Sequence, residues 1–245
     1  MAIAPVGSHG IFSFLTPFFS FAFSFSASTQ LNYKAGEADT DFARRYKHLA
    51  GAKIKTVGDA FAEFTKALGY TVNPLYKNMV TDIVGTTHLI VVNARFQKDA
   101  IWSLGIITAL ELLLKNYPEP EFAEAIVTAL FKCIGMDEAA VRAEAKSITE
   151  WAQGKSKSDI EAALSGEGDS PVASIAKTIK DDSYWMYSRY FGIGLLKLME
   201  NTGVEMDKDE VYPVMETWMN EKLGRSSITA CVSWNKSLLM CDFAF

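Results

Sequence analysis

The sequence has few cysteines and no excess of basic charge. Three cysteines in 245 residues are too few for the disulfide framework of a small secreted domain, and their spacing matches no zinc site. Cys133 lies in an apolar stretch and is expected to be packed in the interior. The sequence leaves undecided whether Cys231 and Cys241, near the end of the chain, form a disulfide bond. The net charge of -5 at pH 7 argues against a nucleic-acid-binding protein, because such proteins present a basic face.

A long internal apolar run is also missing. The most apolar stretches, residues 101–114 and 184–199, are interrupted by Glu111, Arg189 and Lys197. Both fall short of the roughly 20 apolar residues that a bilayer-spanning helix needs. We therefore expect these stretches to be buried helices of the protein core, not membrane spans.

Strand-type alternation of apolar and polar residues is absent from residues 56–224. Apolar residues recur there at helical spacing, between residues that favour helix ends. Thr56 with Asp59, and Ser158 with Glu161, have the spacing of a capping box. The sequence predicts an all-α fold, a single domain of about eight or nine helices packed around two central apolar helices.

The two central helices are expected at residues 184–201 and 102–111. Ten positions in each follow the same order of aromatic, small, aliphatic, glycine and acidic residues, WSLGIITALE and FGIGLLKLME. In the helix expected at residues 184–201, Ser188 and Gly192 lie on the same side, where another helix could approach the backbone closely. The opposite strip of this helix is narrow, so most of its circumference is expected to be buried. That strip consists of Arg189, Ile193, Lys197 and Glu200.

The two ends of the chain differ from the middle. Residues 11–27 are uncharged and rich in Phe and Ser, with the length of the apolar part of a signal peptide but no Lys or Arg before it. We assign residues 1–50 to a targeting presequence and linker, with a membrane anchor left open for the apolar run. Residues 51–224 form the helical domain. Residues 225–245 lose helical periodicity and are expected to form an irregular, loosely attached tail.

No group of residues supports catalysis or cofactor binding. Gly168-Asp169-Ser170 matches the nucleophile motif of one hydrolase class, but all three histidines precede it and no strand leads into it. His88 has valines one turn away on either side, so a metal site is not supported there. We expect His88 to be a hydrogen-bonded core or interface histidine, and no enzymatic activity, metal or cofactor.

Four groups of residues resemble the thylakoid-formation protein family. The strongest match is YSRYFGIGLL at residues 187–196, similar to the family's YSRLFAIGL-type motif. The remaining matches occur in the family's order over residues 56–200, although Lys98 and Thr87 depart from the family pattern. These matches are Pro74, Tyr76, Val80, His88 and Leu89; Phe96, Asp99, Leu104, Gly105 and Thr108; and Ala129, Leu130, Cys133, Gly135, Met136, Asp137 and Arg142.

The resemblance implies a non-catalytic factor in photosystem II biogenesis and thylakoid formation. It implies a location in the chloroplast stroma and peripherally at the thylakoid membrane, after removal of the presequence. The implied partners are the thylakoid membrane-bound ATP-dependent zinc metalloprotease and photosystem II assembly components, with no nucleic acid. The protein-interaction residues we select are Arg189, Lys197, Glu200 and His88.

The sequence leaves undecided the contact that Arg189 makes and an alternative function. Arg189 could pair with a carboxylate of a neighbouring helix, stack on Trp185, or face water. The alternative function is a helical pigment or small-molecule carrier that uses His88 and the aromatic-rich core.

Overall fold

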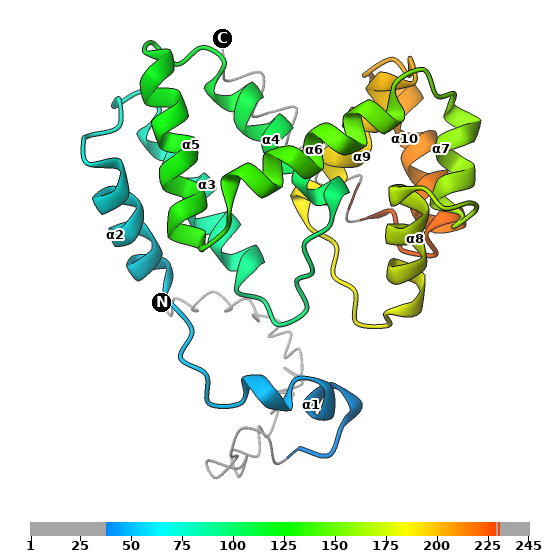
Figure 1. The fold of residues 1–245 in the computed structure, drawn as a ribbon, viewed down its shortest axis with the longest axis horizontal. Coiled ribbons are helices and arrows are strands. Elements are labelled where there is room, and N and C mark those ends of the chain that lie inside the picture. Colours follow the sequence, from blue (N-terminus) through cyan, green and yellow to red (C-terminus); the bar gives the residue numbers. More distant parts are fainter. Residues whose placement is uncertain (1–37, 229, 231–245) are drawn as a thin grey trace, which may run out of the picture.

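All regular secondary structure in the described part of the chain is helical (Figure 1). The computed structural model describes residues 38–228 and 230. Nine α-helices, α2 to α10, lie within the 51–224 range for which eight or nine were expected, so the all-α prediction is confirmed there. The helices are α1 Asp41–Arg45, α2 Val57–Leu68, α3 Lys77–Val91, α4 Ala100–Leu114, α5 Pro120–Ile134, α6 Glu138–Ala152, α7 Lys157–Leu164, α8 Pro171–Asp181, α9 Arg189–Asn201 and α10 Lys208–Glu216, with a 3-10 helix at Lys47–Leu49 and a π-helical segment at Thr217–Lys222.

Capping residues start the helices largely where the sequence places them. Thr56 and Asp59 form the predicted capping box at the start of α2. The second predicted box is wrong by two residues, since Ser156 and Asp159, not Ser158 and Glu161, cap α7. The earlier start leaves Glu161 inside the helix, where its carboxylate lies 3.9 Å from the ammonium of Lys157.

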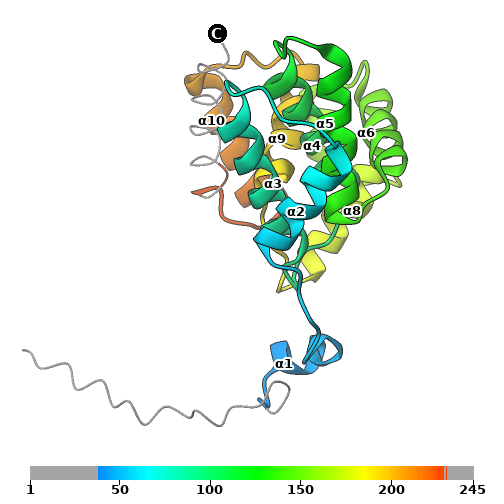
Figure 2. The same ribbon diagram turned by 90° about the vertical axis from the view of Figure 1, so that its left-hand side faces the viewer.

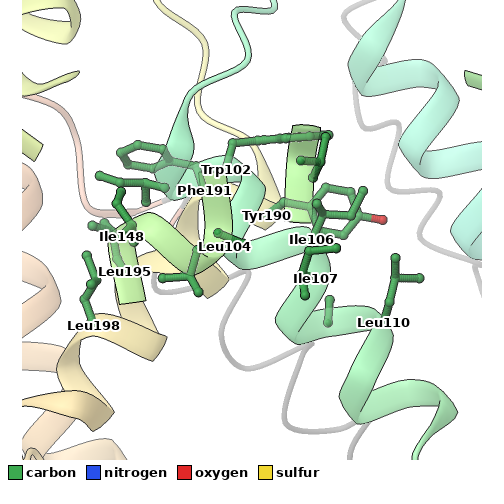
Figure 3. Close-up of a cluster of buried hydrophobic side chains, with 14 of the residues drawn as sticks. Trp102, Leu104, Ile106, Ile107, Leu110, Ile148, Tyr190, Phe191, Leu195 and Leu198 are labelled. Atoms are coloured by element: carbon green, nitrogen blue, oxygen red, sulfur yellow. The ribbon is translucent and has the colours of Figure 1, made fainter. Parts of the chain in front are cut away.

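The core is organised around α4 and α9, which cross each other in their N-terminal halves, with α6 beside α4 (Figure 3). Trp102 and Phe191, the aromatic residues that begin the two similar segments, are 1% and 2% exposed. Edge-on contact of Trp102 with Tyr190, at 5.9 Å between ring centroids, links the two helices. The prediction of two central apolar helices is confirmed.

The two backbones approach most closely at Gly105 and Gly194. A Cβ on Gly105 would overlap the carbonyl oxygen of Tyr190 and lie 2.7 Å from the amide nitrogen of Gly194. A Cβ on Gly194 would overlap the carbonyl oxygen of Ile101. Each helix therefore needs glycine where it crosses the other, because any side chain would separate the backbones.

The predicted start of the second central helix is wrong. Helix α9 begins at Arg189, with Ser188 as its N-cap, and residues 184–187 are not helical. The close approach predicted at Ser188 and Gly192 lies two residues further along the helix, at Tyr190 and Gly194. The space above Gly192 is filled by the phenol of Tyr187, which folds back from the preceding loop.

The loop before α9 is fixed by the carboxylate of Asp182, which is 7% exposed. Arg45 donates two hydrogen bonds to it, at 2.6 and 2.7 Å, and Gln97 donates another at 2.8 Å. The bonds from Arg45 and from the Tyr184 amide outweigh the effect of burial and lower the pKa of Asp182. Through this ion pair the short helix α1, which lies apart from the other helices in both views (Figures 1 and 2), is attached to the loop.

The chain just after Gly224 is attached more firmly than predicted. The guanidinium of Arg225 donates to the backbone carbonyls of Ile179 and Asp182, and lies over the ring of Trp185. Ala230 is 1% exposed. The rest of the predicted tail, with Cys231 and Cys241, and residues 1–37 of the predicted presequence lie outside the described residues.

Helix α4 starts at Asp99, whose side chain accepts a 2.8 Å hydrogen bond from the amide of Trp102. Burial raises the pKa of this carboxyl to about 7, against the opposing effect of the bonds from the Trp102 and Ile101 amides. The folded state then binds a proton that the unfolded state releases above about pH 4. This contribution to stability is present at low pH and is lost as the pH rises through about 7.

Replacing Asp99 with asparagine should therefore flatten the pH dependence of stability. Asparagine caps helices as well as aspartate does, but it does not titrate. We expect Asp99→Asn to gain about 2–3 kcal/mol of unfolding free energy relative to the parent between pH 5 and pH 8. Urea unfolding at the two pH values measures this gain. An equal difference between variant and parent at both values would contradict it.

Candidate interaction surface

Three of the four predicted site residues lie on one strip of α9. Arg189, Lys197 and Glu200 are partly exposed, their side chains 33%, 33% and 55% accessible. Ile193 continues the strip between them and packs partly against the core. With the helical rise of 1.5 Å per residue, the strip spans roughly 16 Å.

Arg189 connects this strip to a neighbouring helix. One of its terminal nitrogens lies 3.6 Å from a carboxylate oxygen of Asp82 on α3. Of the three roles left open for Arg189, pairing with a neighbouring helix is the one observed, and the ring of Trp185 is covered by Arg225 instead. Just beneath this ion pair, the buried hydroxyls of Thr87 and Tyr190 lie 2.5 Å apart. Helices α3 and α9 are thus joined at this point by a surface ion pair and a buried hydrogen bond.

Lys197 and Glu200 pair with each other on the outer side of α9. The ammonium and carboxylate are 2.7 Å apart, and no other partner is recorded for them among the described residues. An exposed pair of this kind contributes little to stability, because water solvates both charges well. Their charges are therefore available to a binding partner without cost to the fold.

His88 does not belong to this surface. It is 2% exposed, and its Nε2 is 2.8 Å from the backbone carbonyl oxygen of Lys55. The prediction that it is a hydrogen-bonded histidine is confirmed, but its selection as a protein-interaction residue is wrong, since its imidazole does not reach solvent. The pigment carrier that uses His88 stays a prediction, and the Nε2 of this imidazole already has the Lys55 carbonyl as its partner.

The part of the surface that α3 supplies was not predicted from the sequence. Asp82 is exposed, and Leu89, two helical turns further along the same helix, is 58% exposed. Residues seven apart share a helix face, so Leu89 adds an apolar contact beside the charges. The sequence feature that indicates this surface is Leu89, a large aliphatic residue that falls outside the apolar periodicity of α3.

Reactive groups in the described residues are few. No cluster of three or more His, Cys, Asp or Glu side chains there could hold a metal ion. Burial raises the pKa of the Cys133 thiol to about 11, so the nucleophilic thiolate is scarce at neutral pH. Ser170, the serine of the hydrolase-like motif, accepts a hydrogen bond from the Ala173 amide as the N-cap of α8.

The fold and this surface define an all-α protein whose exposed charged strip is suited to binding another macromolecule. Among the described helices none has both the length and the apolar character needed to cross a membrane. The sequence profile of the thylakoid formation protein family matches residues 56–232. The chain belongs to this family, as its sequence motifs indicated.

Relatives occur in cyanobacteria and in plants. The chain is 30% identical over 161 residues to Protein Thf1 of Synechococcus elongatus, covering 64% of this chain and 63% of that protein. It is 26% identical over 153 residues to the chloroplastic Protein THYLAKOID FORMATION1 of rice, Oryza sativa, covering 62% and 53%. The Arabidopsis thaliana protein is 25% identical over 151 residues, covering 61% and 50%. The matched region thus spans between half and two thirds of these relatives.

A solved structure has the same fold. It is described as the structure of Psb29 at 1.55 Å, and it superposes with a TM-score of 0.66 at 19% sequence identity. The superposition covers 77% of this chain and 97% of the other. The helical arrangement in Figure 1 is therefore that of a known fold.

Proposed function

We propose that this protein is a non-catalytic auxiliary factor in thylakoid formation and photosystem II biogenesis, acting in a plastid. The observation that carries the proposal is the family match, which extends over the helical body from α2 to beyond α10. The names of the rice and Arabidopsis relatives place those proteins in the chloroplast and in thylakoid formation. We extend the same role to this chain, with a location in the stroma and peripherally at the thylakoid membrane.

The molecular activity we propose is that of a binding scaffold. Its partners would be the thylakoid membrane-bound ATP-dependent zinc metalloprotease and photosystem II assembly components. The surface defined by Asp82, Leu89, Arg189, Lys197 and Glu200 supports this proposal, because it combines both charge signs with an exposed aliphatic side chain on two helices connected by an ion pair and a buried hydrogen bond. Such mixed surfaces suit specific protein contacts.

Complementation tests the general role. The protein is expressed in a cyanobacterium from which Thf1 has been deleted, and photosystem II activity is followed after strong light. We expect recovery to return toward that of the parent strain. A strain that accumulates the folded protein and recovers no better than the deletion strain would count against a role in photosystem II biogenesis.

Charge reversal tests the binding surface. The double substitution Lys197→Glu with Glu200→Lys keeps an i,i+3 ion pair and hence the fold, but it reverses the charges that a partner meets. We expect it to reduce recovery of the metalloprotease in a pull-down from solubilised thylakoid membranes about tenfold, the effect of losing one or two interfacial charge pairs.

The matched control reverses another pair. Lys146 and Glu150 form an exposed i,i+4 pair on α6, 3.7 Å apart, and Lys146→Glu with Glu150→Lys should leave the pull-down unchanged. An equal loss of metalloprotease from the pull-down with both double variants would mean that surface charge in general, and not the α9 strip, governs binding. No loss in either would remove the α9 strip from the interface while leaving the complementation result untouched.

A further inference from the structure

A groove of about 420 Å³ is lined by the last two turns of α2, the loop at residues 69–72 and the start of α3. Helices α2 and α3 lie side by side in Figure 2. Its floor is apolar and consists of Phe64, Leu68 and Val80, each at most 6% exposed. The volume falls within the range of pockets that hold small organic ligands, about 300–1,000 Å³. An apolar chain laid on this floor would be removed from water.

Among the described residues, the charged side chains that line the groove are Lys66 and Lys77, which we call the rim lysines. One comes from each of the two helices, and both are exposed. Neither forms an ion pair with any of the described residues, and no Asp or Glu lines the groove. In a protein of net charge -5, two lysines without a carboxylate partner beside an apolar floor form a local site for an anion.

Hydroxyl groups complete the rim. Thr65, Thr71 and Thr81 are exposed and line the groove together with the rim lysines. The hydroxyls of Thr65 and Thr81 donate to the backbone carbonyls of Phe61 and Lys77 in their own helices. The ammonium groups of the rim lysines and the hydroxyl of Thr71 are therefore the groups that can donate hydrogen bonds to a carboxylate. The groove thus places apolar surface at its floor and cationic donors at its edge.

We propose that this groove binds a single-chain anionic amphiphile, a fatty acid carboxylate with a chain of about twelve carbons. The acyl chain lies on the floor, and the carboxylate is held at the rim lysines. A cationic or neutral chain of the same length would leave the lysines without a counter-charge. A partner helix fits less well, because the two lysines and the exposed threonines at the rim leave it few apolar anchors beyond the floor.

Calorimetric titration with dodecanoate tests the proposal. We expect one dodecanoate to bind per chain, and the double variant Lys66→Gln with Lys77→Gln to bind it about tenfold or more weakly, because charge-assisted hydrogen bonds to the carboxylate are lost. The cation dodecyltrimethylammonium, with the same chain, should not bind. Because the rim lysines are exposed, the double variant should keep its thermal unfolding temperature, which shows that the fold is intact.

The matched control is Lys132→Gln with Lys208→Gln. These two lysines are exposed on α5 and α10 and do not line the groove, so this variant should bind dodecanoate like the parent. Absence of binding by the parent protein would overturn the proposal and leave the groove to another occupant, such as a protein segment. Equal binding by both double variants, or binding of the cation as tight as that of dodecanoate, would also overturn it.

Discussion

Replacing Gly105 with alanine is expected to lower the free energy of unfolding by about 3 kcal/mol or more, a large share of the 5–15 kcal/mol typical of a domain. The added methyl group would overlap the carbonyl oxygen of Tyr190. Backbone of α9 cannot move aside as a flexible side chain could, so the two central helices must separate along much of their contact. Urea unfolding followed by circular dichroism measures the loss, and Gly194→Ala should behave in the same way.

Gly85 provides the control for this substitution. It lies within α3, and a Cβ there would meet nothing closer than Val57 Cγ1 at 3.7 Å. Gly85→Ala should leave stability unchanged or raise it by up to about 1 kcal/mol, because alanine favours helix more than glycine does. If Gly105→Ala proved as harmless as Gly85→Ala, the close crossing of α4 and α9 would be wrong.

Truncating Trp102 to alanine should cost about 3–5 kcal/mol, the usual penalty for removing a large buried aromatic side chain. The indole is 1% exposed and contacts the rings of Phe96 and Tyr190. Its Nε1 has no hydrogen-bond partner among the described residues. Phenylalanine at this position should therefore cost much less, about 1–2 kcal/mol, since it keeps most of the ring packing and loses no hydrogen bond.

The contrast between the two replacements is the informative result. Chemical unfolding of both variants under the same conditions gives it directly. A phenylalanine variant as unstable as the alanine variant would show that the indole nitrogen is hydrogen-bonded and that packing is not the main contribution of Trp102.

The fold was predictable because its local signals agree with its packing. Thr56 starts α2 at the expected place, and the two apolar segments are both buried. The similar order of residues in these segments has a physical basis, since Gly105 and Gly194 occupy matched positions and meet at the crossing. The sequence shows which residues are small, but it does not show which backbone each one faces, so the contact was assigned to Gly192 instead.

The start of α9 could not be predicted from periodicity. Tyr184 and Tyr187 continue the apolar pattern of the helix, yet they belong to a loop whose path is set by hydrogen bonds to Asp182. Those bonds come from Arg45 and Gln97, which are 137 and 85 residues away in the chain. Tertiary contacts of this range leave no local pattern.

The candidate surface was predicted in part. The polar strip of α9 follows from helical spacing alone, and Arg189, Lys197 and Glu200 lie where that spacing puts them. His88 is polar but buried, since the backbone carbonyl of Lys55 satisfies it. A buried polar residue with a backbone partner and a surface polar residue look alike in a sequence. The contribution of α3 depends on which helix lies beside α9, which again is a tertiary property.

The hydrogen bond between Thr87 and Tyr190 joins residues 103 positions apart in the chain, and the close approach of α4 to α9 joins Gly105 to Tyr190, 85 positions further along. During synthesis, the face of α4 that packs against α9 therefore stays uncovered until most of the chain has left the ribosome. Such non-local closure is slow compared with local helix formation. Fragments that stop before residue 189 should consequently accumulate as insoluble material in cells. Chains that extend past residue 201 contain α9, which covers the apolar face of α4.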